Sequence, residues 1–292
     1  MGSKGGRGRD RFAAFTQRIT PGGLLVVCAD HPGTRTLAAA VAAAPLKVIG
    51  YGTAADADYQ VSDVQPRGMG SAFTMAARGP RPAQPGEERV ELAVPGRHNV
   101  LNAAAALAAA VELGVPWPQA AVGLAAYRGA QRRLELKGEA GGVRVLDSYA
   151  HHPTELAADL RAARDVAGTG RVIAVFQPHL YSRTRIFAAE FGAALGLADL
   201  VFVLDVYAAR EDPEPGVTGR LVADAVPGGG ARYLPDAVAV PAAVAGLARP
   251  GDVVLTMGAG DVTKLGPPLV AALTGLTGLT GLTGLTGQET AG

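Results

Sequence analysis

The chain has 292 residues, which suggests about two domains and is enough to bury a sizeable core. Its net charge of +1 gives no bulk attraction to nucleic acid or membranes, and no apolar stretch approaches the roughly 20 residues that span a bilayer. The single cysteine, Cys28, excludes a disulfide framework within the chain and fits a reducing cytoplasm, where we expect the protein to reside.

The two ends of the chain differ from the rest in composition. Residues 1–10 are basic and glycine-rich, lack the apolar core of a secretion signal, and are expected to be disordered. From Leu273 to Gly287 the triplet Leu-Thr-Gly occurs five times in succession. Because a period of three fits neither a helix nor a strand, residues 274–292 are interpreted as a low-complexity tail.

The first half of the chain has a mixed pattern of hydrophobic periods and turn residues. Several of its segments are short and alternate in polarity, which indicates antiparallel strands. The predicted elements are, in order, a strand at 24–29, a helix at 34–44, strands at 47–52, 58–65, 71–78 and 89–94, and helices at 97–114 and 117–127.

After Tyr127 the chain alternates regularly between helices and continuous apolar strands. We expect a hairpin over 132–149 with its turn at Gly141-Gly142, then helices at 153–167, 184–198, 219–226, 237–248 and from near Asp261, and strands at 171–176, 200–206, 231–235 and 252–258. This alternation predicts an α/β fold with a mostly parallel sheet covered on both faces. We place a domain boundary near residue 128, which gives domains at 11–128 and 129–273.

Polar loops of unusual content follow four of the strands predicted in the second half. They are "DSYAHHPTE", "QPHLYSRTR", "DVYAAREDPEPG" and "GAGD". Ligands of open parallel sheets bind beyond the carboxyl ends of the strands, so we expect these four loops to form one rim. Two of the chain's five histidines, His151 and His152, belong to this rim rather than to a core.

The start of the helix after the paired histidines can be predicted in detail. His152 precedes a proline and is pushed out of the helical region, Pro153 suits the first helical position, and Glu155 falls in the first turn. We expect this helix to offer free amides beside His151 for a carboxylate or a phosphate.

Each of these features also has a simpler interpretation. A histidine in a loop is more often a solvated or capping residue than a catalytic one. Arg183 and Arg185 fit a charged helix face, and Gly258, Gly260 and Asp261 fit a tight turn with an N-cap. A functional site is favoured because all of these residues are expected to lie together on one rim.

A second polar cluster lies in "GRHNVLNA" and "QRRLEL". Asn99 and Asn102 are three residues apart and share a helix face. Amides can read the edge of adenine, but an N-cap Asn plus a solvent-facing Asn explains the spacing equally well. Arg132 and Arg133 are adjacent in a strand and point to opposite faces, so at most one of them faces a phosphate in a cleft.

Six segments together resemble the Mur ligase family: "PGRHNVLNAAAA", "GAQRRLEL", "DSYAHHPTE", "FQPHLYSRT", "DVYAAREDP" and "GAGD". They match the second half of these enzymes in order and spacing, from about Arg11 to about Leu273. The combination of "YAHHPTE" with "QPHLYSRT" favours the branch that adds L-alanine to UDP-N-acetylmuramate. The branch that recycles muropeptides shares "HHPT" but typically lacks the second loop, and ranks second.

The resemblance implies a partial central domain of the ATPase type followed by a Rossmann-like C-terminal domain. It implies an ATP-dependent peptide ligase of cytoplasmic peptidoglycan synthesis: ATP phosphorylates the muramoyl carboxylate, and L-alanine attacks the acyl phosphate. ATP, L-alanine and UDP-N-acetylmuramate are the expected small-molecule partners, with Mg²⁺ as the expected metal of the family. Neither nucleic acid nor a membrane is expected as a partner.

On the nucleotide side, the resemblance makes Asn99 and Asn102 look like adenine contacts. It makes Arg133 look like a phosphate contact that reaches across the domain junction. Ser148 stands where the family usually has an Asp associated with the nucleotide ribose.

On the amino-acid side, the resemblance implies that His151 and His179 are catalytic, by orienting the amine or helping to remove its proton. Tyr149 and Arg183 are implied to bind L-alanine, because a guanidinium holds a carboxylate bidentately.

The sequence also departs from the family. None of its four lysines is followed by Ser or Thr, so the phosphate loop is absent from these residues, as are the family's magnesium motifs and UDP-sugar domain. No metal ligand is therefore assigned, and the chain is expected to begin where the central domain is already half complete. Besides Ser148, Leu180 stands where many members have Arg.

These departures leave three hypotheses. The chain is a ligase by descent in fragmentary form, or a non-catalytic amino-acid or nucleotide-binding module. One form of the second hypothesis is half of a split ligase that a complementing N-terminal chain completes. The third hypothesis is a purely structural α/β domain whose loops are relics.

Overall fold

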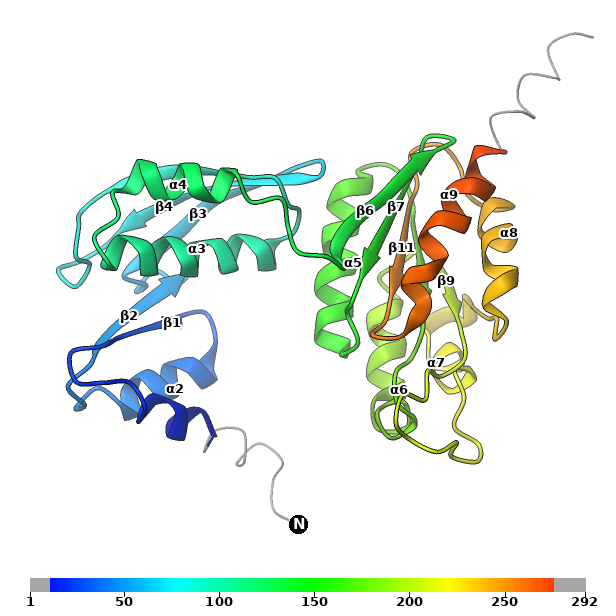
Figure 1. Cartoon of the computed structure of the whole chain (residues 1–292), viewed down its shortest axis with the longest axis horizontal. Coiled ribbons are helices and arrows are strands. Elements are labelled where there is room, and N and C mark those ends of the chain that lie inside the picture. Colours follow the sequence, from blue (N-terminus) through cyan, green and yellow to red (C-terminus); the bar gives the residue numbers. More distant parts are fainter. Residues whose placement is uncertain (1–10, 276–292) are drawn as a thin grey trace, which may run out of the picture. The chain divides into compact units, whose positions relative to one another are not determined.

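A computed structural model describes residues 11–275, which divide into two compact units between Arg128 and Gly129 (Figure 1). The first unit ends at Arg128 and the second begins at Gly129, and each is described by itself below. The expectations for residues 1–10 and for residues 276–292 lie outside the described residues.

The first unit is built on a five-stranded sheet in the order β1-β2-β3-β4-β5. β1, β2 and β3 run parallel, and β3, β4 and β5 pair antiparallel, as predicted for the three short strands. The elements are β1 (Leu24–Cys28), α2 (Pro32–Ala40), β2 (Lys47–Gly52), β3 (Tyr59–Arg67), β4 (Gly70–Ala77), β5 (Glu87–Leu92), α3 (Arg97–Glu112) and α4 (Trp117–Ala125).

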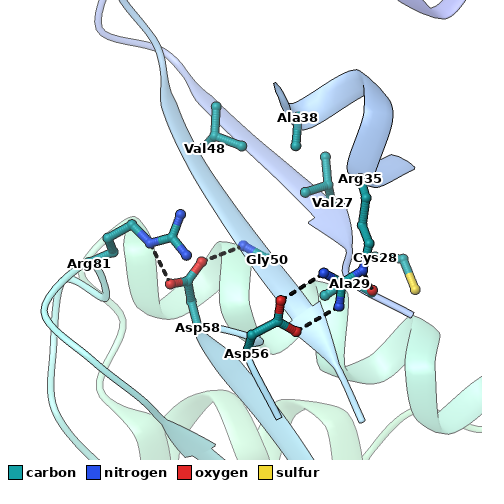
Figure 2. A pocket seen from close by; sticks show the side chains of 10 residues that line it. All are labelled: Val27, Cys28, Ala29, Arg35, Ala38, Val48, Gly50, Asp56, Asp58 and Arg81. Atoms are coloured by element: carbon teal, nitrogen blue, oxygen red, sulfur yellow. Dashed lines mark hydrogen bonds and ion pairs between the residues drawn. The ribbon is translucent and has the colours of Figure 1, made fainter. Parts of the chain in front are cut away.

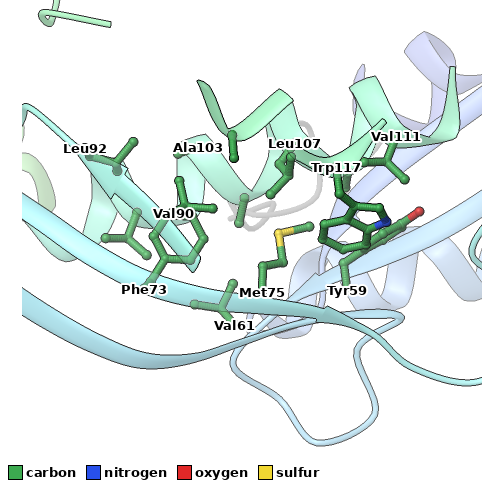
Figure 3. Packing of buried hydrophobic residues seen from close by; sticks show 14 of the residues in the cluster. Tyr59, Val61, Phe73, Met75, Val90, Leu92, Ala103, Leu107, Val111 and Trp117 are labelled. Atoms are coloured by element: carbon green, nitrogen blue, oxygen red, sulfur yellow. The ribbon is translucent and has the colours of Figure 1, made fainter. Parts of the chain in front are cut away.

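Helix α3 supplies the centre of the first unit's core. Its buried residues recur at the spacing of one helix face: Val100, Ala103, Ala104, Leu107, Ala108 and Val111. This face packs on Phe73 and Met75 of β4, and the Tyr59 and Trp117 rings lie beside it with centroids 5.6 Å apart (Figure 3). The sequence "NVLNAAAALAAAV" favours a helix because alanine has the highest helix propensity, and its buried residues join the core of the sheet.

The second unit contains a six-stranded sheet in the order β10-β9-β8-β11-β7-β6. All neighbours run parallel except the β6–β7 hairpin, which confirms the predicted α/β class with a mostly parallel sheet. The elements are β6 (Arg133–Ala140), β7 (Val143–Ser148), α5 (Pro153–Ala167), β8 (Val172–Phe176), α6 (Tyr181–Leu195), β9 (Leu200–Val203), α7 (Arg220–Asp224), η1 (Pro227–Gly229), β10 (Ala231–Tyr233), η2 (Ala237–Ala239), α8 (Val240–Ala245), β11 (Val253–Met257), η3 (Asp261–Leu265) and α9 (Gly266–Thr274).

The central strands of this sheet are buried on both faces. Every residue of β8 and β11 is buried, which explains their continuous apolar sequence. On one face Ile173 and Val175 join the core formed with α8 and α9. On the other face Phe176 packs on Phe191 of α6, with ring centroids 5.1 Å apart.

Several predicted boundaries were wrong by a few residues. The first helix covers 32–40 instead of 34–44, because Pro32 starts it and His31 caps it. Helix α6 begins at Tyr181 rather than Thr184, which places Arg183 in its first turn. The segment from Asp261 is first a 3₁₀ turn and becomes α-helical only at Gly266. The turn of the hairpin was correct: Gly141 and Gly142 both have positive φ, as a two-residue type I′ turn requires.

Candidate functional site

The rim of the second unit is formed by the ends of four neighbouring strands. β9, β8, β11 and β7 lie side by side in that order, and all four run parallel. Their carboxyl ends therefore meet at one edge of the sheet, which is where the four polar loops begin. A bridge between His179 and Tyr207 joins two of these loops directly.

Four rings from three loops form a continuous cluster on this rim. Tyr149 lies edge-on to His151, with centroids 5.2 Å apart, and His151 lies edge-on to His179 at 6.3 Å. His179 in turn stacks on Tyr207, with centroids 5.7 Å apart and planes inclined by 15°. The structure thus brings together three of the predicted residues, Tyr149, His151 and His179, and adds Tyr207.

The surroundings of His179 favour the neutral form of its imidazole. Burial lowers the pKa of its imidazole below the usual 6.5, and the positive charge of Arg183 and the neighbouring His151 lower it further. Its Nδ1 atom is buried without a hydrogen-bond partner among the residues that the structure describes. A neutral ring with a free nitrogen can accept a proton or a hydrogen bond at pH 7.

Arg183 lies in the first turn of α6, close enough to His179 for its charge to act on that ring. Its Nη1 atom is buried, and no residue in the described range accepts a hydrogen bond from it. Glu211 lies nearby but is engaged by Ser182, whose hydroxyl and N–H both donate to its carboxylate and lower the pKa of Glu211. The second cation of this helix, Arg185, pairs with Glu214 at 2.8 Å.

The paired histidines have different surroundings. His152 is the N-cap of α5, with extended backbone angles, Pro153 at the helix start and Glu155 in the first turn, as predicted. Its ring accepts the Thr154 N–H and lies edge-on to Phe187, with centroids 5.1 Å apart. His152 is thus a capping residue, whereas His151 belongs to the ring cluster.

The expectation of free amides at this helix start was wrong. Glu155 Oε2 accepts the N–H of His151 at 3.0 Å and that of His152 at 3.2 Å, which completes a capping box. The same carboxylate lies 3.4 Å from His151 Nδ1, and that nitrogen lies 2.9 Å from the Tyr149 carbonyl oxygen. These groups orient the His151 ring instead of leaving an anion site.

Ser148 is fully buried at the end of β7. Its hydroxyl donates to Asp159 Oδ2 and accepts the Ala150 N–H at 3.0 Å. Both functions of the hydroxyl are therefore used within the protein. This geometry does not favour the nucleotide contact predicted for Ser148.

The "GAGD" loop packs tightly against the rim. Gln177 donates to Asp261 Oδ1 at 2.9 Å and accepts the Val262 N–H at 3.1 Å. A Cβ on Gly260 would lie 2.4 Å from Gln177 Oε1 and 2.6 Å from Tyr207 Cγ, so only glycine fits there. Asp261 follows the N-cap position, which Gly260 occupies, and its role is to hold Gln177.

In the first unit, Asn99 and Asn102 line one open pocket of about 240 Å³. Its other walls are mostly apolar: Leu92, Val94, Ala103, Ala106, Leu124 and Tyr127. Asn99 also donates to the Pro95 carbonyl oxygen at 2.8 Å, which leaves its amide oxygen available, while Asn102 is exposed. An apolar slot with two amides can take a flat heterocycle.

A second pocket of the first unit, of about 180 Å³, is lined by charged residues that neutralise each other (Figure 2). Arg35 forms a bidentate pair with Asp56, at 2.7 and 2.6 Å. Asp58 accepts the Gly50 N–H at 2.7 Å and pairs with Arg81 at 2.7 Å. The carboxylates of Asp56 and Asp58 are thus already paired with arginines of the same pocket.

The two adjacent arginines of the second unit differ, but not through the strand alternation that was predicted: β6 begins at Arg133, and Arg132 lies in the turn before it with a φ of +56°. Arg133 opens β6 with an exposed side chain that forms no ion pair with any residue from 11 to 275. The Arg132 side chain instead lies within the unit, against the "GAGD" loop and Asp147.

Sequence reasoning missed Tyr207, Gln177 and Arg132 as parts of the rim. Tyr207 and Gln177 lie in segments already singled out, "DVYAAREDP" and "FQPHLYSRT". Gln177 directly follows β8, and Tyr207 lies four residues beyond the end of β9. Their proximity to the strand end was the available signal.

Comparison with known proteins decides the family. The Mur ligase middle domain matches residues 9–110, and the glutamate ligase domain of Mur ligases matches residues 132–260. The chain belongs to the Mur ligase family. It is 57% identical over 264 residues to a UDP-N-acetylmuramate–L-alanine ligase of Kineococcus radiotolerans, covering 90% of this chain and 55% of the relative. It is 51% identical over 265 residues to the enzyme of that name from Streptomyces avermitilis, with coverages of 90% and 56%.

Solved structures of Mur ligases share the fold. The UDP-N-acetylmuramate-alanine ligase of Thermotoga maritima superimposes with a TM-score of 0.71 at 24% identity, covering 92% of this chain and 55% of that one. A murein peptide ligase of Psychrobacter arcticus gives 0.62 at 22% identity, with coverages of 91% and 54%. The chain thus spans about half the length of the Mur ligases it matches. Between residues 11 and 275, no helix is long and apolar enough to cross a membrane.

Proposed function

We propose that this chain forms part of an ATP-dependent ligase that joins L-alanine to UDP-N-acetylmuramate in peptidoglycan synthesis. The observation that carries the proposal is the rim cluster, in which the His179 imidazole and the Arg183 guanidinium each keep a buried polar atom that no residue from 11 to 275 pairs with. Buried polar atoms of this kind are costly unless a ligand satisfies them. The high identity to enzymes named for this reaction supports L-alanine as that ligand.

On the amino-acid side, Arg183 is proposed to bind the carboxylate of L-alanine through its unpaired Nη1 and a neighbouring N–H. His179 is proposed to accept the proton that the ammonium group must lose before its nitrogen can attack an activated carboxyl carbon. His151, between Tyr149 and His179, is proposed to orient this ring and to take part in proton transfer. Tyr149 forms the outer wall of the site.

On the nucleotide side, the pocket of Asn99 and Asn102 is proposed to hold adenine between its apolar walls. The exposed guanidinium of Arg133 is proposed to contact a phosphate. ATP supplies the phosphoryl group that activates the muramoyl carboxylate. Mg²⁺ is expected from the family resemblance, but no three His, Cys, Asp or Glu side chains gather as a metal site among the described residues, so no step is assigned to it.

A second candidate function is binding without catalysis, either as a module or as half of a split ligase. It is favoured by the absence of any Lys-Ser or Lys-Thr pair from these 292 residues, because phosphoryl transfer in such enzymes needs a phosphate-binding lysine. We expect purified residues 1–292 to bind L-alanine but to release no phosphate from ATP when all substrates are present. Phosphate release above a no-protein control would exclude the binding-only candidate.

Calorimetric titration with L-alanine, and separately with ATP, tests the assignment. Arg183→Ala is expected to weaken L-alanine binding by about 30-fold or more and to leave ATP binding unchanged, since a charged hydrogen bond contributes about 2 kcal/mol. Arg185→Ala is the matched control, because Arg185 lies two residues away and pairs with the partly exposed Glu214. Equal affinity of the Arg183→Ala and parent chains for L-alanine would refute the assignment. Tight binding of a muropeptide instead of L-alanine would favour the recycling branch.

A further inference from the structure

Arg132 makes an unusual number of contacts for a residue at a strand start. Its Nε donates to Asp147 Oδ2 at 3.1 Å, while Nη2 and Nη1 donate to the carbonyl oxygens of Gly258 and Gly260. Its guanidinium carbon lies 4.9 Å from the centroid of the Tyr149 ring. Its carbonyl oxygen accepts the Tyr149 N–H at 2.7 Å. One residue thus touches β7, the loop after β11 and a member of the ring cluster.

The carboxylate that anchors Arg132 is itself fixed. Asp147 is fully buried and also accepts hydrogen bonds from Thr256 Oγ1 at 2.7 Å and Thr263 Oγ1 at 2.8 Å. A buried carboxylate with three donors has little freedom to move. The backbone of Arg132 has a φ of +56°, a conformation that costs a non-glycine residue energy and is retained where the surroundings determine it.

These contacts close a ring of neighbours around the rim. Arg132 lies over Tyr149, Tyr149 contacts His151, His151 contacts His179, and His179 stacks on Tyr207. The Tyr207 ring lies directly against Gly260, whose carbonyl oxygen accepts a hydrogen bond from Arg132. Arg132 therefore contacts one end of the aromatic chain, Tyr149, directly and reaches the other end, Tyr207, through Gly260.

We propose that Arg132, anchored by Asp147, is a positioning residue that holds Tyr149 and the Gly258–Asp261 loop at a fixed separation and so sets the geometry of His151 and His179. The proposal rests on the proposed function only for its consequence, which is the affinity for L-alanine. Lysine cannot replace Arg132, because an ammonium group lacks the planar fork that reaches a carboxylate and two carbonyl groups at once.

The test compares Arg132→Lys with Arg171→Lys in the whole chain. Arg171 makes a similar set of contacts before β8, at the amino-terminal edge of the same sheet: it binds the buried Asp252 at 2.7 Å and the Leu247 carbonyl oxygen at 2.6 Å. Both substitutions are expected to lower thermal stability by similar amounts. Only Arg132→Lys is expected to change the ring NMR signals of Tyr149, His151 and His179, measured with ¹³C-labelled tyrosine and histidine.

The same variants are then titrated with L-alanine by calorimetry. Arg132→Lys is expected to weaken binding about tenfold, whereas Arg171→Lys leaves it unchanged. Unaltered ring signals and affinity in Arg132→Lys would overturn the proposal, and so would equal ring shifts in both variants. If the parent chain binds no L-alanine, the proposed function fails, but the ring signals of the ligand-free chain still decide this inference.

Thr263→Val provides a second, milder variant if Arg132→Lys does not fold. It removes one of the three donors to Asp147 and leaves the Arg132 side chain in place. The ring signals are expected to shift in the same direction as in Arg132→Lys but by less. Signals identical to those of the parent chain would count against the proposal.

Discussion

The buried carboxylate of Glu112 stabilises the first unit, and a single substitution can measure its contribution to the free energy of unfolding. Its side chain is 1% exposed, at the end of α3. Oε1 accepts the Tyr59 hydroxyl at 2.7 Å and the Ala83 N–H at 2.9 Å, while Oε2 accepts no hydrogen bond of ordinary geometry but lies 2.6 Å from Lys47 Nζ. One side chain thus connects α3 to β2, β3 and the segment before β5.

The cost of Glu112→Ala follows from these contacts. Two hydrogen bonds to a charged group contribute about 1.5–3 kcal/mol each, and their loss leaves the buried Tyr59 hydroxyl without its acceptor. The Lys47 pair adds about 1 kcal/mol at most because Lys47 is 42% exposed. The helix dipole disfavours an anion at the C-terminus of α3, so removing the carboxylate offsets about 0.5 kcal/mol of this loss. We expect the first unit to lose about 2.5–6.5 kcal/mol.

Urea unfolding followed by Trp117 fluorescence is a suitable assay, because this tryptophan, the single one in the chain, packs on Tyr59. Lys47→Met is the matched control and is expected to cost less than about 1 kcal/mol. A loss below 1 kcal/mol in Glu112→Ala would refute the reasoning. The hydrogen bonds to Glu112 would then be no more favourable than the bonds that the same groups make to water in the unfolded chain.

The same carboxyl predicts a pH dependence. Burial opposes its ionisation, but the ammonium group of Lys47 and the hydrogen bonds from Ala83 and Tyr59 outweigh burial and lower the pKa of Glu112 below its usual 4.5. The contribution to stability is therefore complete above pH 4.5 and is lost as the pH falls through the folded-state value. In Glu112→Gln, the unfolding free energy is expected to change less between pH 6 and pH 4 than in the parent chain.

Three further predictions concern other parts of the molecule. Because the pKa of His179 is lowered, the unfolded chain takes up the proton first, so stability of the second unit falls as the pH drops below 6.5; His179→Gln, followed by circular dichroism, should flatten this dependence. Gly260→Ala should cost about 1–3 kcal/mol and shift Tyr207, whereas Gly230→Ala, which has open space around it, should cost far less in the same melt. β1 is an edge strand in the described range, so its amides should exchange with deuterium faster than those of β8; strong protection of β1 would contradict this.

Much of the fold was accessible from the sequence because hydrophobic period and burial coincide. Strands such as "VIAVF" are apolar throughout since they are covered on both faces, and this pattern alone placed β8 and β11 in a parallel sheet. Helix ends were less accessible. Helix α6 begins at Tyr181, directly after Leu180, whose φ is +72°. A leucine gives no indication in the sequence that its backbone adopts this conformation.

The location of the rim could be predicted from the sequence, but the contacts among its residues could not. The ends of neighbouring parallel strands must meet, so Tyr149, His151 and His179 were expected to be close. The stacking of Tyr207 on His179 depends on the path of a loop after β9, and the role of Arg132 depends on a positive φ. Neither feature produces a periodic pattern in the sequence.

The two adjacent histidines show how a helix cap and a binding site share one set of interactions. His152 caps α5 and contacts Phe187 of α6, so it relates the start of α5 to the helix whose first turn carries Arg183. Glu155 accepts the amide protons of both histidines and lies beside the His151 ring. The energy that stabilises the helix start therefore also orients the imidazole. A substitution of Glu155 would therefore alter the rim even though Glu155 itself contacts no ligand.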